Sequence, residues 1–343
     1  MNCVSNRFSN GWDFRKRNGS NEYSPNLLPG GPARARRSGP RSHNQAHGPF
    51  RQTHAMIATV FQLYRRLGRP IRLKYGYYDC GSETLYTIHD AGIGSCMMVT
   101  LHNLADLFNG GIRPAHVSFS KTMLAFKDGD RHEDIYPRLF SASPRTFDLP
   151  SQPGREAKLP RPDGGKRYSE FPYALYGPLI KRYFQPSASV EETLCGWLEK
   201  YAIDLDKCAT VCIRGTDKFL EVRPIDSSIY IRRVERVLEQ GQIKRVLIQT
   251  DQEEIAQVFL KYFGGVCFCV EELPRTSGGM AMHLTPLIEG RRTQFARDIL
   301  AIILLMSRSR YVITHTGNLG AWIALFRGHT DSMYQMIPGE EFL

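Results

Sequence analysis

The feature that most constrains the fold is a regular alternation of strand-like and helix-like segments after residue 208. Short runs of β-branched and apolar residues alternate with longer amphipathic stretches. The expected strands cover residues 209–213, 245–249, 266–270 and 311–314. The expected helices cover residues 229–238, 252–263, 293–307 and 319–326. Such alternation is typical of a parallel sheet covered by helices on both faces, so we expect an α/β fold.

The first half of the chain shows the same pattern in fewer places. Strand-like segments at residues 71–75 and 85–88 lead to a turn that contains Gly92 and Gly94, and an apolar helix is expected over residues 97–108. A strand, a glycine turn and a helix make half of a doubly wound unit. The N–H groups at such a helix start favour an anion, although tight turns need glycine with or without a ligand.

Composition divides the chain further. Residues 1–52 hold so few apolar residues that we expect a disordered tail. Residues 1–55 contain nine Lys and Arg against two Asp and Glu, so they supply +7 of the formal charge of +11. Contact of this tail with RNA or another polyanion is one interpretation, and a solvated leader is the other. The predicted domains are residues 53–185 and 186–343, each with a Rossmann-like fold.

No transmembrane or secretory segment is apparent. The longest apolar run, residues 299–306, is too short to span a bilayer and is expected to be a core helix. We therefore expect a cytoplasmic protein. The chain has eight cysteines, and four of them lie in or beside apolar strand-like runs, which favours buried thiols and a reducing compartment. These four are Cys208, Cys212, Cys267 and Cys269.

Charged and hydroxyl-bearing side chains follow three of the expected strands. The carboxyl ends of parallel strands meet at one edge of a sheet, and ligands bind there. The first strand is followed by Arg214, Asp217 and Lys218, the second by Asp251 after Thr250. An arginine fork and a lysine suit a diphosphate, while a turn closed by an internal Arg–Asp pair is the alternative. The third loop contains Thr314, His315, Thr316 and Gly317, which would either bind an anion or cap a helix.

Two acidic features have a structural and a functional interpretation. Asp298 lies on the buried side of the expected core helix, where it would pair with an arginine or accept hydrogen bonds from a guanine. Asp128 and Asp130 form an Asp-x-Asp sequence, which one class of glycosyltransferases uses for metal, but it lies beside basic residues in a loop.

These motifs, in this order, resemble those of the α-1,6-fucosyltransferases and the rhizobial nodulation fucosyltransferases, which are related to protein O-fucosyltransferases. Residues 212–218 with Glu221 are similar to the family motif His-Val-Arg-Arg-Thr-Asp-Lys followed by Glu. Residues 248–252 resemble a strand that ends in Thr-Asp-Asp, and residues 314–317 resemble a Thr-Phe-Ser-Ser turn. Gly215 stands where the family has a second arginine, and Cys212 where it has a histidine.

The resemblance implies a GT-B-like fold, with two Rossmann-type halves and GDP-fucose in the cleft between them. It implies an inverting fucosyl transfer to a glycan or glycoconjugate without a metal or other cofactor. By position, Arg214 would neutralise the diphosphate, Asp298 would read guanine, and Thr316 would bind the β-phosphate. Lys218 and Glu221 would handle the proton of the acceptor hydroxyl. The remaining donor-binding positions are Gly92, Gly94, Asp217, Thr250, Asp251, Thr314 and Gly317.

Two other functions remain open at the level of sequence. A GT-B transferase could use a different nucleotide sugar, because no residue pattern identifies the sugar pocket. A catalytically degenerate protein could bind a glycan or, through its basic tail, RNA.

Overall fold

Five parallel strands form the larger sheet, as the alternation predicts. In the computed structural model the strand order is β7-β6-β5-β8-β9, and every neighbouring pair is parallel. The strands are β5 (Cys208–Ile213), β6 (Arg245–Thr250), β7 (Cys267–Phe268), β8 (Tyr311–His315) and β9 (Met333–Met336). Because β5 is central, the residue that follows it, Arg214, is flanked by the ends of β6 and β8.

The structure describes residues 61, 63–64, 66–141, 159–161, 163–215, 225–277 and 280–340. Three of the expected site residues, Asp217, Lys218 and Glu221, lie outside them, as does the basic segment 1–52. The described residues belong to one unit, Pro49–Leu343, which contains both expected domains.

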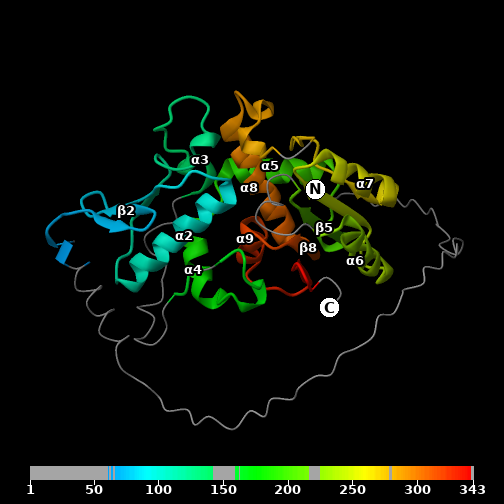
Figure 1. The fold of residues 1–343 in the computed structure, drawn as a ribbon, viewed down its shortest axis with the longest axis horizontal. Helices are drawn as coiled ribbons and strands as arrows, with labels where there is room; N and C mark the ends of the chain where they lie inside the picture. The colour runs from blue at the N-terminus through cyan, green and yellow to red at the C-terminus, as the bar shows by residue number, and fades with distance from the viewer. Residues whose placement is uncertain are drawn as a thin grey trace, which may run out of the picture. The chain divides into compact units, whose positions relative to one another are not determined.

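Helices cover both faces of this sheet, which confirms the expected α/β arrangement of the second half. Side chains of α6 (Ser227–Glu239) and α7 (Glu253–Phe263) pack on one face, in a core that includes Val211 and Ile248. Side chains of α8 (Arg292–Arg308) and α9 (Asn318–Arg327) pack on the other, in a core that includes Cys212 and Leu247. Figure 1 shows the two helix pairs on either side of β5 and β8. The apolar run at 299–306 is the buried centre of α8, as expected.

The first half forms a smaller mixed sheet of four strands. Its strands are β1 (Ile71–Leu73), β2 (Gly76–Asp79), β3 (Thr84–Thr87) and β4 (His116–Ser118), in sequential order. The first three pair antiparallel, and only β3 and β4 are parallel, joined through α2 (Ile93–Asn109). The expected strand, glycine turn and helix are therefore present, and β4 follows them.

The described residues do not confirm that the first half of the chain is a Rossmann-type domain. The reason lies in β2, which the sequence analysis did not predict. A tight turn at Lys74 and Tyr75 folds β2 back onto β1. Gly76 has a φ of +153° and lies so close to the carbonyl of Tyr86 that a Cβ atom would clash there. The hairpin adds antiparallel strands where a doubly wound fold would add parallel ones.

Further helices connect the two sheets. They are α3 (Tyr136–Leu139), α4 (Tyr173–Tyr183) and α5 (Ala188–Lys200). Short 3₁₀ helices occupy Leu124–Phe126 (η1), Tyr168–Glu170 (η2), Leu205–Lys207 (η3), Gly264–Val266 (η5), Met282–Leu284 (η6) and Pro286–Ile288 (η7). Within the described ranges, no helix combines the length and the apolar character needed to cross a membrane.

The Asp-x-Asp sequence has a structural role. Asp128 Oδ1 accepts a hydrogen bond from the N–H of Arg292 (2.6 Å), and Oδ2 accepts one from the N–H of Thr293 (3.0 Å). Asp128 therefore caps the start of α8 from a loop of the first half, where a carboxylate also complements the helix dipole. Asp130 accepts a hydrogen bond from the N–H of His132, within its own loop. The two carboxylates are engaged in backbone contacts.

Candidate functional site

A cavity of about 390 Å³ lies at the carboxyl ends of the parallel strands, where the sequence analysis expects the site. Its walls include residues 212–214 at the end of β5 and residues 249–251 at the end of β6. The start of α2 closes it from the first half of the chain, and α9 and α8 contribute further wall residues. The cavity therefore draws residues from both halves of the unit.

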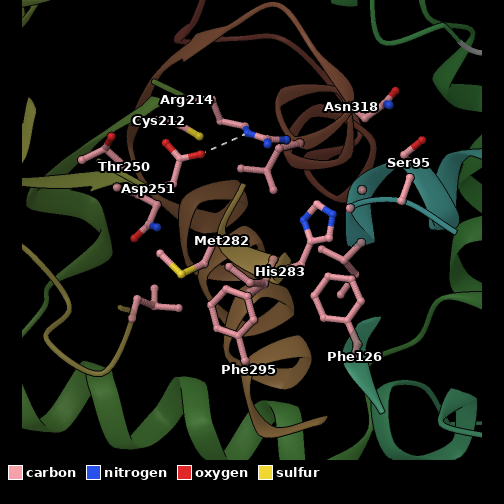
Figure 2. A pocket seen from close by; sticks show the side chains of 18 of the residues that line it. Ser95, Phe126, Cys212, Arg214, Thr250, Asp251, Met282, His283, Phe295 and Asn318 are labelled. Atoms are coloured by element: carbon pink, nitrogen blue, oxygen red, sulfur yellow. Dashed lines mark hydrogen bonds and ion pairs between the residues drawn. The ribbon is translucent and has the colours of Figure 1, made fainter. Parts of the chain in front are cut away.

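Arg214 and Asp251 form an ion pair at one end of this cavity (Figure 2). The Arg214 Nε atom lies 3.4 Å from Asp251 Oδ2, and the N–H of Gly215 donates to Asp251 Oδ1 at 2.9 Å. This contact follows from the register, in which Ile213 lies beside Thr250. The pair within one turn that the sequence leaves open would involve Asp217, which lies outside the described residues, and the pair with Asp251 joins the ends of two neighbouring strands.

Gly215 is packed against α7. A Cβ atom at this position would clash with the side chain of Gln252 and lie 2.6 Å from Ile255 Cδ1. A second arginine here would therefore require Gln252 and Ile255 to move.

The starts of α2 and α9 meet beside the cavity. A Cβ atom at Gly94 would lie 3.3 Å from the backbone nitrogen of Leu319, and the indole N–H of Trp322 donates to the carbonyl of Gly94 at 3.0 Å. Neither helix has a side-chain cap of its own or an acidic residue in its first turn. The two helix starts, which have no acidic residue in their first turns, therefore present their positive ends to the same cavity, although Asp90 just before α2 also lines it.

The threonine-rich loop before α9 is engaged elsewhere. Thr316 Oγ1 donates to the carbonyl of Met336 at 3.0 Å and accepts from Gln335 Nε2 at 3.1 Å. The N–H of Gly317 donates to the hydroxyl of Tyr168, and Thr314 is buried in β8. None of these three residues lines the cavity, whereas Asn318 and Leu319 do. The start of α9 thus contributes to the cavity wall, whereas the Thr316 hydroxyl bonds to β9, and phosphate binding by Thr316 stays a prediction.

Asp298 lies behind the cavity wall. Its exposed fraction is 3%, and its Oδ1 atom accepts a hydrogen bond from Gln294 Nε2 at 2.6 Å. Burial raises the pKa of this carboxyl, and the hydrogen bond from Gln294 and then the charges of Arg291 and Arg297 oppose that rise. The burial expected from the sequence is confirmed. Its neighbour Ile299 lines the cavity but Asp298 does not, so guanine recognition by Asp298 stays a prediction.

Of the expected site residues, Gly92, Gly94, Arg214, Thr250 and Asp251 line this cavity, and so does His315. His315 Nδ1 lies 3.2 Å from the carbonyl oxygen of Cys212, which ties β8 to β5 behind the site.

An aromatic wall that no sequence pattern predicts lies at the other end of the cavity. Phe126 of η1, His283 of η6 and Phe295 of α8 lie together there, although they are far apart in the sequence. No periodic pattern in the sequence marks Phe126 or His283, because neither lies in an expected helix or strand. Only the apolar face of α8 could have indicated Phe295.

Among known proteins, similarity to this chain was found in solved structures. No protein-family model matches the sequence, and no curated protein matches it. The chain is similar to NodZ α-1,6-fucosyltransferase co-crystallised with GDP, with 14% identity and a TM-score of 0.28 over 43% of this chain and 44% of that chain. It is similar to the apo form of POFUT1, with 10% identity and a TM-score of 0.30 over 48% of this chain and 49% of that chain.

A third similar structure is a mutant of Arabidopsis thaliana FUT1 in complex with GDP. The identity is 13% and the TM-score 0.34, over 79% of this chain and 52% of that chain. The matched parts thus span about half or less of the length of these three solved chains.

Proposed function

We propose that this protein is a glycosyltransferase that binds GDP-fucose in the cavity and transfers fucose to a hydroxyl of a glycan or glycoconjugate. The observation that carries the proposal is the convergence of the Arg214 guanidinium and the starts of α2 and α9 on one cavity. This cavity lies at the carboxyl ends of parallel strands, where α/β proteins bind nucleotides.

The polar end of the cavity suits a diphosphate. An arginine presents a planar set of N–H donors that matches phosphate oxygens, and helix starts add backbone N–H groups and a positive dipole end. The cavity volume, about 390 Å³, falls in the range of about 300 to 1,000 Å³ that is usual for small-molecule sites. Asp251 holds the guanidinium in place from the Nε side.

In the proposed reaction the acceptor hydroxyl oxygen attacks the anomeric carbon of fucose while the bond from that carbon to the β-phosphate oxygen breaks. GDP leaves with the electron pair of that bond, and the hydroxyl proton passes to Glu221, which with Lys218 is the residue that the family resemblance assigns to this step. Negative charge grows on the leaving diphosphate in the transition state. In the proposed mechanism Arg214 and the two helix starts stabilise this charge, the role that Mg²⁺ has in other transferases.

The proposal is tested by a donor titration. Isothermal titration with GDP, GDP-fucose and UDP should give binding of the two guanine nucleotides and weaker binding of UDP. Incubation with GDP-fucose should release GDP. The fucose should appear either as free fucose, after transfer to water, or attached to an added glycan. If neither GDP nor GDP-fucose binds, the proposed function is wrong. If UDP binds more tightly than GDP, the protein uses a different nucleotide sugar.

A further inference from the structure

The outer face of the smaller sheet carries a pair of tyrosine rings. A row of strand partners crosses its four strands and consists of Arg72, Tyr77, Tyr86 and Ser118. Successive residues of a strand point to opposite faces of a sheet. Leu85, which precedes Tyr86 in β3, is buried in the core that includes α2, so the row lies on the face away from that core.

One face of the Tyr86 ring is left open by its neighbours. The rings of Tyr77 and Tyr86 stack with their centroids 4.9 Å apart and an interplanar angle of 21°. Because β3 lies between β2 and β4, the other face of the Tyr86 ring is turned toward β4. The ammonium of Lys121 lies 4.9 Å from the centre of the Tyr77 ring and 5.8 Å from that of Tyr86, so it does not cover this face. Both tyrosines are half-buried.

A cavity of about 330 Å³ lies beside this open face. Tyr86 of β3 and Ser118 of β4 line it from the sheet, and Asp134 lines it from the loop before α3. Within the described residues, it shares no lining residue with the cavity beside Arg214, the donor cavity. Its volume falls within the range of about 300 to 1,000 Å³ that is usual for small-molecule sites. It is therefore a second candidate binding site.

The carboxylate of Asp134 is held in a fixed orientation. Its Oδ1 atom accepts hydrogen bonds from the N–H of Phe119 at 2.8 Å and from the N–H of Tyr136 at 3.0 Å. In the part of the chain that the structure describes, no group bonds to Oδ2. Hydrogen bonds to an ionised carboxylate are stronger than those between neutral groups. The cavity thus combines one open aromatic face with one positioned acceptor.

We propose that this second cavity binds a neutral carbohydrate, with a sugar ring stacked on Tyr86 and its hydroxyl groups bonded to Asp134. A pyranose with equatorial hydroxyl groups has flat C–H faces and a polar rim. The C–H groups carry a partial positive charge and suit the negative face of an aromatic ring, and the rim suits a carboxylate. A carboxylate at the same place repels an acidic sugar, which favours a neutral one.

A short segment connects the tyrosine pair to the donor cavity. Lys121 lies beside the pair and Phe126 lines the donor cavity, so the Cα atoms of these two residues are at most about 18 Å apart. Lys127 Nζ donates to the carbonyl of Ser120 at 2.8 Å and holds the two ends of the segment together. A chain of a few sugar units spans that length. That the bound glycan is also the acceptor rests on the proposed function, whereas carbohydrate binding at Tyr86 does not.

The test is a calorimetric titration of the full chain with cellohexaose, which is neutral and has equatorial hydroxyl groups, and with a heparin hexasaccharide, which is anionic. Tyr86→Ala removes the ring and Tyr86→Phe keeps it, while Tyr86→Leu keeps apolar volume in case Tyr86→Ala does not fold. Asp134→Asn keeps an oxygen for the N–H groups of Phe119 and Tyr136 but removes the charge. Tyr262→Ala is the matched control, because Tyr262 is a 56% exposed tyrosine of α7. Each variant is also titrated with GDP.

We expect the wild-type protein to bind cellohexaose more tightly than the heparin hexasaccharide. The affinity for cellohexaose should fall by at least about threefold in Tyr86→Ala or Tyr86→Leu and by about tenfold in Asp134→Asn. Tyr86→Phe should keep most of this affinity, Tyr262→Ala should keep all of it, and GDP should bind equally to every variant.

Three results would overturn the inference. They are a wild-type protein that does not bind cellohexaose, an affinity for cellohexaose that neither Tyr86 nor Asp134 influences, and tighter binding of the heparin hexasaccharide. Any of these together with normal GDP binding leaves the proposed function intact. If cellohexaose binds in a manner that depends on Tyr86 and Asp134 but GDP and GDP-fucose do not bind, the carbohydrate site is supported and the proposed function is wrong.

Discussion

Asp251 and Arg214 face each other from the ends of two neighbouring strands, with Arg214 Nε 3.4 Å from Asp251 Oδ2. The same carboxylate accepts the N–H of Gly215 at 2.9 Å, so it fixes both the backbone and the side chain at the end of β5. The pair is partly buried, with exposed fractions of 27% for the Arg214 side chain and 15% for that of Asp251. The guanidinium is therefore positioned before any ligand arrives.

The first prediction concerns this pair. Asp251→Asn keeps an oxygen for the Gly215 N–H but removes a negative charge from the polar end of the cavity. We expect pyrophosphate to bind more tightly, by about tenfold or less, because a like charge beside the ligand is gone. Calorimetric titration at low salt measures the change. Weaker pyrophosphate binding would contradict this prediction and would show that the loss of the contact that positions Arg214 outweighs the removal of the negative charge.

The second prediction concerns Asp298 and pH. Burial raises the pKa of this carboxyl above its value in the unfolded chain, so the folded state binds the proton more tightly. The resulting stability is fully present below the unfolded pKa and is lost as pH rises through the folded pKa. At neutral pH the charged carboxylate lowers the stability of the folded state, so Asp298→Asn should raise the midpoint of urea unfolding.

The gain in stability from Asp298→Asn should disappear near pH 3, because the wild-type carboxyl is then protonated in both the folded and the unfolded protein. The same variant should weaken GDP binding if Asp298 reads guanine. A variant that is less stable than the wild type at pH 7 would contradict the account of this carboxyl.

The third prediction concerns the cap of α8. Asp128→Ala leaves the N–H groups of Arg292 and Thr293 without the carboxylate, and loss of a cap costs about 1 kcal/mol of the free energy of unfolding. Asp130→Ala is the matched control. The Asp130 carboxylate bonds within its own loop, so its removal should lower the free energy of unfolding by less. Urea denaturation followed by circular dichroism gives both values, and equal losses would argue against the cap.

The sequence predicted the parallel sheet because each of its segments carries a local pattern. Burial of Asp298 could also be predicted, from its position on the apolar face of α8. What the sequence could not indicate depends on contacts between distant segments. Thr316 bonds to Met336, and Asp128 bonds to Thr293. Strand β2 was missed because Gly76 and Asp79 are poor strand formers.

The fourth prediction concerns the thiols. Burial raises the pKa of Cys212 to about 12 and that of Cys208 to about 11, whereas Cys195 is exposed. The thiolate is the reactive form, so Cys212 in the folded protein should react with iodoacetamide at pH 8 on the order of a thousandfold more slowly than Cys195. Peptide mass spectrometry over a time course measures both rates. Comparable rates in the native protein would mean that β5 is not buried at the centre of the sheet.

The central claim, that Arg214 and the two helix starts bind a diphosphate, is tested most directly by titrating Arg214→Ala with GDP and pyrophosphate. The control is Arg161→Ala, which removes an arginine that pairs with Asp106 and does not line the cavity. The account predicts an unchanged unfolding midpoint within about 1 °C, a loss of at least about tenfold in affinity for both ligands in Arg214→Ala, and none in Arg161→Ala. Retention of wild-type affinity for both ligands by Arg214→Ala would contradict it.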